Sequence, residues 1–272
     1  MSKSVYVLVM SLFLLSSGLR AENWVIQTVD NEGDIGYATK CWYDSQGQPN
    51  LLYTSSNVYS VGILYHTRWT GAGWLRTEIA TQVIYKFLQF VSIAPDTVAI
   101  CYGTGSTSYP HIYYATWTGG DSWNVTEIPG TTQAFNLSLA FDVASNPHIF
   151  YPKDYWSDRL VHIYRNSSGS WQNVDTVTYS DMDYENYSVA IDGLNHIFLV
   201  YRTTTGNLKM SYYDGTAWGT EYVDESSDNV GTYCRIILDS ADVPHIVYYD
   251  QTNTQLKYAT WLMPPKTRYE TE

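Results

Sequence analysis

Tryptophan recurs at nearly equal intervals along the chain, and this regularity limits the possible folds more than any other feature of the sequence. Five tryptophans lie 50, 49, 48 and 47 residues apart, at Trp24, Trp74, Trp123, Trp171 and Trp218. Each one opens a short run in which apolar and polar residues alternate, such as WVIQTVD or WGTEYVD. A period of two indicates a β-strand with one buried face. The spacing therefore predicts a repeated unit built from strands.

Three more apolar runs precede each later tryptophan and complete the unit. Between residues 187 and 224 they read YSVAID, HIFLVYR and LKMSYYD, and WGTEYVD follows them. The first run of each unit is the most continuously apolar, which is typical of a strand packed on both faces. Aromatic residues make up 16% of the chain and include 26 tyrosines, which favour pleated, half-buried surfaces. Four antiparallel strands repeated around an axis describe the blades of an all-β fold, the β-propeller.

The two ends of the repeat predict how the ring closes. The chain begins with an outer strand that has no inner strand before it, residues 24–30, and the fifth unit stops after three strands at residue 261. We expect residues 24–30 to complete the last blade, which gives a closed five-bladed β-propeller without exposed edges. The alternative is that TRYETE, residues 267–272, completes that blade and the first strand pairs elsewhere. The propeller is predicted to span residues 22–261, with units near 31–80, 81–130, 131–178, 179–225 and 226–261 and a tail at 262–272.

The N-terminus has the pattern of a secretory signal peptide. Lys3 precedes an almost wholly apolar run from Val5 to Leu15, and cleavage is expected after Ala21. This run is too short to span a bilayer, and no later stretch is long enough to do so. We therefore interpret residues 1–21 as a signal peptide and expect the protein to be secreted, periplasmic or on the cell surface.

Charge and cysteine content narrow the partners and the chemistry. The formal net charge is −12, from 27 acidic and 15 basic residues, which makes nucleic acid or an anionic lipid surface an unfavourable partner. The three cysteines, Cys41, Cys101 and Cys234, each lie inside an apolar run. We expect small buried core residues. The alternative is a bridge between Cys41 and Cys234 that would join the first and last units.

The repeat resembles the tandem repeats of secreted propellers of the sialidase-like, BNR-type superfamily. The shared pattern is S-x-A-x-D, then N-P-H-I-x-Y, then L-K-Y-A and W-x-x-E-x-V-D, carried here by Ser188, Asp192, Pro244-His245-Ile246, Leu256-Lys257-Tyr258-Ala259 and Trp218. The resemblance covers essentially the whole chain after residue 21 and implies a fold, not a reaction. Sialidases of this kind use three arginines for the substrate carboxylate, whereas only Arg235 lies on an expected inner strand. Sialidase activity is therefore disfavoured, and no catalytic residue is assigned.

Acidic and histidine residues repeat at equivalent positions. Four of the five inner runs end in a carboxylate, at Asp44, Asp142, Asp192 and Asp239, and three second strands open with His148, His196 and His245. A repeated position predicts equivalent turn caps rather than an acid and a base in distinct environments. The alternative is a glycoside hydrolase of the furanosidase type, with Asp142 and Asp192 converging at the ring axis.

The loops between units are rich in carboxylates, and one of them could hold a metal. Asp181, Asp183 and Glu185 alternate in sequence and would supply hard oxygen ligands to calcium. A solvated acidic rim is the other interpretation. Calcium at these three residues is the only cofactor that the sequence suggests.

Aromatic and polar residues gather in the loops expected on one face of the ring, here called the loop face. Aromatic rings beside amides and carboxylates suit sugars, because the rings stack on C–H faces while polar groups bind the hydroxyls. The candidate ligand-binding residues are Tyr59, Tyr109, Tyr155, Trp156, Tyr184 and Tyr233. We expect an exported, non-catalytic module that binds a glycan or an extracellular protein. A glycoside hydrolase and a purely structural surface repeat remain as alternatives, and the oligomeric state is open.

Overall fold

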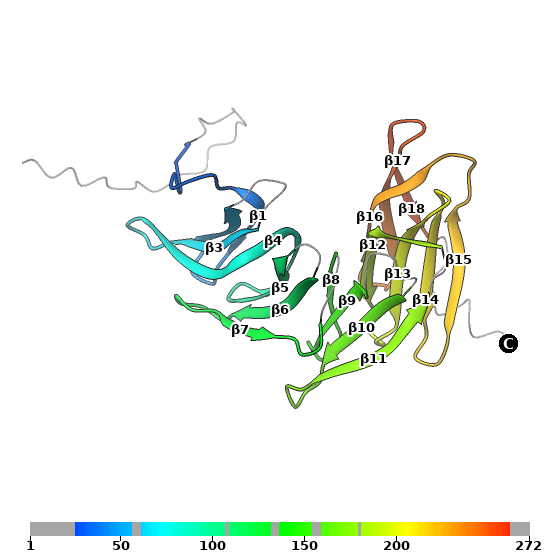
Figure 1. Ribbon diagram of the computed structural model, residues 1–272, viewed down its shortest axis with the longest axis horizontal. Helices are drawn as coiled ribbons and strands as arrows, with labels where there is room; N and C mark the ends of the chain where they lie inside the picture. The colour runs from blue at the N-terminus through cyan, green and yellow to red at the C-terminus, as the bar shows by residue number, and fades with distance from the viewer. Residues whose placement is uncertain are drawn as a thin grey trace, which may run out of the picture.

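The computed structural model describes residues 25–55, 61–106, 109–131, 136–153, 159–178 and 181–261, and all regular structure in these ranges is β (Figure 1). Each sheet is an antiparallel meander in chain order. The first and largest sheet has seven strands: β1 (Tyr37–Tyr43), β2 (Pro49–Ser55), β3 (Gly62–Trp69), β4 (Trp74–Ala94), β5 (Thr97–Ser106), β6 (Tyr109–Trp117) and β7 (Asn124–Glu127).

Three smaller sheets follow. The next two have four strands each and the last has three: β8 (Ser138–Phe141), β9 (Pro147–Pro152), β10 (Arg159–Arg165) and β11 (Trp171–Thr178); β12 (Met182–Ile191), β13 (Ile197–Thr203), β14 (Leu208–Tyr213) and β15 (Trp218–Asp224); β16 (Val230–Leu238), β17 (Pro244–Asp250) and β18 (Gln255–Thr260). The outer strands β4, β11 and β15 begin at predicted tryptophans, which confirms the strand pattern read from the repeat.

The strand β4 belongs to two units at once. Its first part, up to Val83, pairs with β3, and its second part, from Val83 to Ala94, pairs with β5. A shift of register between Ile84 and Gln89 marks the place where one role passes to the other. We therefore divide the chain into five blades. Blade 1 is β1 to β3 with the start of β4, blade 2 is the end of β4 with β5 to β7, and blades 3, 4 and 5 are the three smaller sheets.

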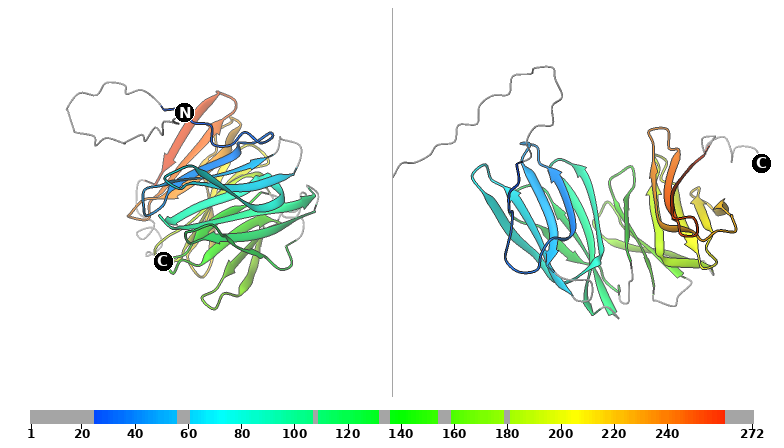
Figure 2. Two further views of the ribbon diagram at one scale, coloured as in Figure 1. Left: turned by 90° about the vertical axis from the view of Figure 1, so that its left-hand side faces the viewer. Right: turned by 90° about the horizontal axis from the view of Figure 1, so that it is seen from above.

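Four apolar cores hold successive blades face to face. Blades 1 and 2 share Leu52, Leu64, Val98 and Ile100, for example, while blades 4 and 5 share Phe198, Val200, Cys234 and Ile236. Corresponding cores join blade 2 to blade 3 and blade 3 to blade 4. Within the described ranges no such core joins blade 5 to blade 1. Figures 1 and 2 show the reason, because the blades form an open arc with blades 1 and 5 at its two ends.

The predicted completion of blade 5 by the N-terminal strand is not found in this structure. Residues 25–30 form no regular strand, and β18 is hydrogen-bonded to β17 alone among the strands described. The segment lies on blade 1 instead, because Asp30 accepts a hydrogen bond from the Tyr53 hydroxyl (2.7 Å) and Gln27 accepts one from the Trp74 indole (3.3 Å). Trp24, the predicted signal peptide and the tail at 262–272 lie outside the described residues. No helix in the part of the chain that is described is long and apolar enough to cross a membrane.

The cysteines divide into two environments. Cys101 and Cys234 are fully buried, as expected for core residues, whereas Cys41 is exposed on β1, so its predicted burial is wrong. All three are free thiols, and the alternative Cys41–Cys234 bridge is not formed. Cys41 is exposed because it lies on the face of blade 1 that no other blade covers.

The repeated carboxylates cap turns, as the sequence predicts. One carboxylate oxygen of Asp192 accepts hydrogen bonds from the backbone N–H groups of Leu194 and His196, both at 2.8 Å. Asp142, Asp239 and Asp44 accept equivalent backbone bonds in their own turns. The caps fix the turn between the first and second strand of each blade.

Candidate functional site

Three of the six predicted ligand-binding residues, Tyr59, Tyr155 and Trp156, lie outside the described residues. Tyr109 and Tyr184 have a described backbone, in β6 and β12, but their side chains are not described. Tyr233 is fully described and is 74% exposed. Its backbone has a φ of +56°, which is a genuine outlier for a bulky residue. This conformation is held from the neighbouring blade, because Asn186 accepts the Tyr233 N–H at 2.7 Å.

A polar network joins blades 4 and 5 beside Tyr233. Asn186 donates to Asp183 (3.1 Å), and Asp183 forms an ion pair with Arg202 (2.6 Å). Arg202 donates a second bond to Asn229 (2.6 Å), which lies before β16. The amide, the carboxylate and the guanidinium are therefore occupied largely with one another, and they rigidify this part of the loop face.

Two of the three predicted calcium ligands, Asp181 and Asp183, have carboxylates that are already paired with cations of the chain. Asp181 forms an ion pair with Lys209 (2.6 Å), and Asp183 is paired with Arg202. The backbone N–H of Glu185 donates to Asp183. No group of three or more His, Cys, Asp or Glu residues with metal-site geometry occurs among the residues described. Calcium at Asp181, Asp183 and Glu185 stays a prediction.

The repeated histidines link each turn to the third strand of the same blade. In blade 4, His196 Nδ1 lies 2.8 Å from Asp192 Oδ2 and 2.8 Å from the Tyr212 hydroxyl. In blade 3, His148 lies between Asp142 (3.6 Å) and His162 (2.8 Å), and burial lowers the pKa of His162 to about 3. This arrangement supports the predicted structural role, since both carboxylates face their own turns.

A polar pocket of about 320 Å³ opens between blades 1 and 2, at the turns opposite the loop face. We call it the turn-face pocket. It is lined by Asp44, Ser45, Gln46, Gln48, Arg68, Trp69, Thr70, Asp96, Trp117, Thr118, Gly119 and Gly120. Its volume is within the range of small-molecule sites.

An arginine and an indole ring in the lining provide the chemistry at this pocket, and the arginine is held by an ion pair with Asp121, which lies next to the lining. Arg68, at the end of β3, contacts Asp121 in the turn after β6 through both Nε (2.8 Å) and Nη2. Both contacts go to Oδ1 of Asp121, whose side chain is 62% exposed. Trp69 packs edge-on against Trp74 with ring centroids 5.4 Å apart. The pocket therefore presents fixed donors and acceptors beside an aromatic surface.

Sequence reasoning missed this pocket because its residues come from turns of two different units. Arg68 and Trp69 end the run ILYHTRW of the first unit, and Gly119 and Gly120 belong to the turn TGGDS of the second. The signal in the sequence that could have indicated the pocket is the Arg68-Trp69 pair at the end of one third strand, together with two consecutive glycines after the third strand of the next unit. Gly119 and Gly120 both have positive φ, +96° and +80°, so the turn needs glycine there.

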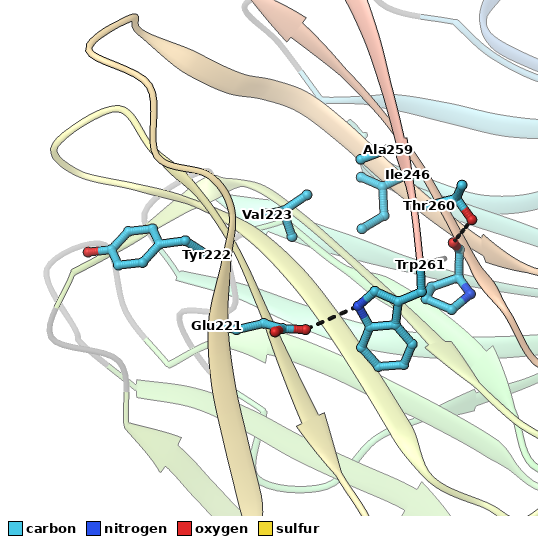
Figure 3. Close-up of a pocket in the computed structure, with 8 residues that line it drawn as sticks. Glu221, Tyr222, Val223, Ile246, Ala259, Thr260 and Trp261 are labelled. Carbon is cyan, nitrogen blue, oxygen red and sulfur yellow. Dashed lines mark hydrogen bonds between the residues drawn. The ribbon is translucent and has the colours of Figure 1, made fainter. Parts of the chain in front are cut away.

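A second, smaller groove of about 240 Å³ lies between β15 of blade 4 and β17 and β18 of blade 5 (Figure 3). The indole of Trp261 donates to Glu221 at 3.1 Å across the groove. Trp261 also packs on Phe198 and Tyr212, with ring centroids 5.7 and 6.3 Å apart. The groove is therefore part of the packing between two blades, and its contacts show how an outer strand docks on the next blade.

Comparison with known proteins supports the fold. No family model and no curated protein sequence matches the chain. Among solved structures, a fucose-recognising six-bladed β-propeller lectin of the fungus Aleuria aurantia aligns with a TM-score of 0.57 at 13% identity, over 82% of this chain and 73% of that chain. AofleA from Arthrobotrys oligospora aligns with a TM-score of 0.59 at 14% identity, over 84% and 69%. The SapL1 lectin, solved with α-methyl fucoside, gives 0.53 at 12% identity, over 85% and 84%. The chain thus has a β-propeller fold, and these identities establish nothing finer.

Proposed function

We propose that this chain is a non-catalytic carbohydrate-binding β-propeller and that the turn-face pocket holds the sugar. The observation that carries the proposal is that Arg68 and Trp69 both line a cavity of about 320 Å³, and Arg68 is held there by Asp121, the residue that follows Gly120 of the lining. A sugar hydroxyl both donates and accepts a hydrogen bond, so a guanidinium held next to a carboxylate can bind two adjacent hydroxyls. The indole offers an apolar surface for the C–H face of the ring.

The fixed geometry of the pocket favours binding. One oxygen of Asp121 accepts from two nitrogens of Arg68, and this double contact restricts the rotamers of the guanidinium. The Trp117 indole donates to Gly120 (3.0 Å), which fixes the turn that carries Asp121. Little side-chain entropy is then lost when a ligand binds. The structural neighbours are lectins, two of them solved with fucose derivatives, which supports a small neutral sugar as the ligand class.

The finer expectations from the sequence remain proposals. They are membership of the sialidase-like superfamily, export, a closed five-bladed ring, and binding through the loop face around Tyr233, to a glycan or to an extracellular protein. Calcium at Asp181, Asp183 and Glu185 is a further one. A rise in melting temperature on adding calcium, lost in Asp183→Asn, would support it.

Titration of the protein with L-fucose and a panel of neutral sugars, followed by tryptophan fluorescence and calorimetry, tests the proposal. We expect saturable binding that Trp69→Ala or Asp121→Asn abolishes, while Tyr233→Ala leaves it intact. Asp121 is exposed, so its substitution leaves the fold undisturbed. Loss of binding in Tyr233→Ala alone would move the site to the loop face. Absence of binding to any sugar on a glycan array would overturn the proposed function.

A further inference from the structure

Blade 5 lacks a fourth strand, while a segment with the sequence of a fourth strand lies at the other end of the arc. Residues 25–30 continue the WVIQTVD run, which matches WGTEYVD, the outer strand β15 of blade 4. The edge of β18 is unpaired among the described strands. The segment and the free edge are thus complementary, and the arc keeps them apart (Figure 2).

The tyrosine contact of this segment on blade 1 repeats one that β15 makes on blade 5, and the accompanying ion pair is similar but uses a cation from a different strand. Asp224, the last residue of β15, accepts a hydrogen bond of 2.8 Å from the Tyr248 hydroxyl and binds Lys257. Asp30, at the same position of its run, accepts a 2.7 Å bond from Tyr53 and binds Arg76. In both places the cation lies over a tyrosine ring, Lys257 over Tyr248 and Arg76 over Tyr65.

A second contact is similar, although its donor in blade 1 lies on the outer strand β4 and not at the end of the third strand. Glu221, the fourth residue of WGTEYVD, accepts from the Trp261 indole (Figure 3), and Gln27, the fourth residue of WVIQTVD, accepts from the Trp74 indole. Trp74 is the cross-strand partner of Trp69. Trp69 ends the third strand of blade 1, and Trp261 comes directly after the third strand of blade 5. Residues 25–30 therefore already lie on blade 1 as the outer strand of a preceding blade would.

Apolar side chains are exposed on both ends of the arc. On blade 5 these are Ile237, Leu256 and Tyr258, exposed by 68%, 80% and 58%. On the other end they are Val25, Ile26 and Tyr43, at 84%, 92% and 67%. The arc has four cores between five blades, and a ring of five blades would have a fifth core built from these two faces.

We propose that residues 25–30 add to the free edge of β18 in the same chain and close the arc into a five-bladed ring. The pairing of β14 with β15 gives the register. There Tyr212 lies opposite Gly219 and Met210 opposite Glu221. Tyr258 corresponds to Tyr212, because each bonds the histidine of its own blade. Tyr258 therefore lies opposite Val25, and Leu256 opposite Gln27.

The junction between blades 5 and 1 lacks one bond that other junctions have. The backbone N–H after the capping aspartate donates to a side chain in the next blade, from Val143 to Asn195 and from Gly193 to Asp242. At the closing junction the donor is Ser240, but the acceptor position is Gly47, which has no side chain. The closing junction therefore lacks a contact that holds blade 3 to blade 4 and blade 4 to blade 5.

Disulfide trapping tests the closure without reference to sugar binding. We would place Val25→Cys and Tyr258→Cys together in a Cys41→Ser background and oxidise the purified protein. Cys101 and Cys234 are buried, and burial raises the pKa of the Cys234 thiol to about 12, so neither reacts. The expected product is a monomer with an internal bridge that migrates faster without reductant.

The matched control places the cysteine at Thr28 instead of Val25. Thr28 is three residues out of register with Tyr258 and on the opposite face of the strand. We expect at least tenfold less bridging in Thr28→Cys with Tyr258→Cys. Equal bridging in both pairs, no bridging in either, or bridges only between two chains would each overturn closure within one chain. Bridges between chains would assign the free edge to the N-terminal segment of a second copy.

Discussion

The carboxylate of Asp30 accepts a hydrogen bond of 2.7 Å from the hydroxyl of Tyr53, across 23 residues of chain. Asp30 also binds Arg76, and its side chain is only 8% exposed. Burial alone would raise the pKa of Asp30, but the hydrogen bonds from Arg76, Glu32 and Tyr53 outweigh it and lower the pKa. The segment before blade 1 is thus fastened by a charged, partly buried contact.

The first prediction concerns this contact. Asp30→Asn should destabilise the protein by about 1–3 kcal/mol, since hydrogen bonds to charged groups contribute in that range. Tyr53→Phe should cost about 1 kcal/mol, and the double variant should cost less than the sum of the two. Urea unfolding of the four proteins measures the coupling. Strict additivity would show that the two side chains do not interact.

A side chain at Gly47 should strengthen the closing junction. Gly47 has a φ of +72°, close to the +66° of Asn195 at the equivalent turn position, and a Cβ there meets no atom within 4 Å. Gly47→Asn supplies the missing acceptor for the Ser240 N–H, worth about 1 kcal/mol. The melting temperature should rise by about 2–4 °C. Gly71→Asn, in an open turn with φ +85° and no such donor, is the matched control and should not raise it.

Ile237 reports whether the outer face of blade 5 is covered in solution. If the arc stayed open, Ile237→Ser would change stability by less than about 0.5 kcal/mol, because the side chain is 68% exposed. In the closed ring it packs against blade 1, and we expect a loss of about 1–3 kcal/mol. Val143→Ser, 67% exposed on a turn of blade 3, serves as the control. Equal effects in the two variants would contradict coverage.

Arginine and lysine should not be interchangeable in the turn-face pocket. Arg68→Lys keeps the charge but cannot contact Asp121 through two nitrogens in one plane. We expect sugar affinity to fall at least about tenfold, which is 1.4 kcal/mol. Arg165→Lys is the control, because Arg165 bonds Gly169 in a turn of blade 3 outside the pocket. Calorimetric titration of both variants separates the outcomes, and unchanged affinity in Arg68→Lys would exclude the ion pair from binding.

Acid should destabilise the protein through buried histidines before it protonates the paired carboxylates. His66 Nε2 lies 2.9 Å from Asn50 Oδ1, and His66 Nδ1 accepts from the Trp123 indole at 3.2 Å, so the ring fits only as the neutral Nε2–H tautomer. Burial lowers the pKa of His66 to about 4. As the pH falls, His66 therefore binds a proton near pH 6.5 in the unfolded chain but only near pH 4 in the folded protein.

The sign of this effect sets the pH window. Stability from His66 is complete above pH 6.5 and is lost as the pH falls towards 4, by about 3 kcal/mol. Asp224 acts at lower pH: burial raises its pKa, but hydrogen bonds from Lys257 and Tyr248 outweigh this and hold the pKa at about 2. Its contribution is lost below pH 4. Urea unfolding at pH 7 and pH 4.5 should show a smaller acid loss in His66→Phe, and an NMR titration of His66 near pH 6.5 would refute the prediction.

The sequence was sufficient for the strands and the turn caps, because both depend on local pattern. Alternation places one face of each strand in a core, and an aspartate before a turn binds the backbone just after it, as Asp192 does. The continuity of β4 was missed, although residues 81–89 contain no glycine or proline. The boundary between the first two repeats suggested a loop in this segment. In the structure it pairs with β3 and then with β5, so β4 continues as one strand.

Long-range arrangement was harder to predict from pattern. The sequence assigns residues 24–30 to an outer strand, but it cannot decide between the edge of β18 and the face of blade 1, since both offer partners to the same alternating run. The turn-face pocket is lined by residues of two units, and Arg68 in its lining contacts Asp121, which is 53 residues away in the next unit. A repeat search compares equivalent positions and does not reveal such contacts between different positions.

The shared strand β4 affects which parts of the molecule unfold locally and which unfold together. Blades 1 and 2 have a common backbone ladder of 21 residues, so neither can detach without breaking hydrogen bonds of the other. Hydrogen exchange at β3, β5 and β6 should therefore be governed by one cooperative opening, while blade 5, whose strands β16 to β18 form a separate sheet, exchanges through a smaller local unfolding. The turn-face pocket lies within the slow-exchanging unit, and its ligand would find the same site in nearly every molecule of the native ensemble.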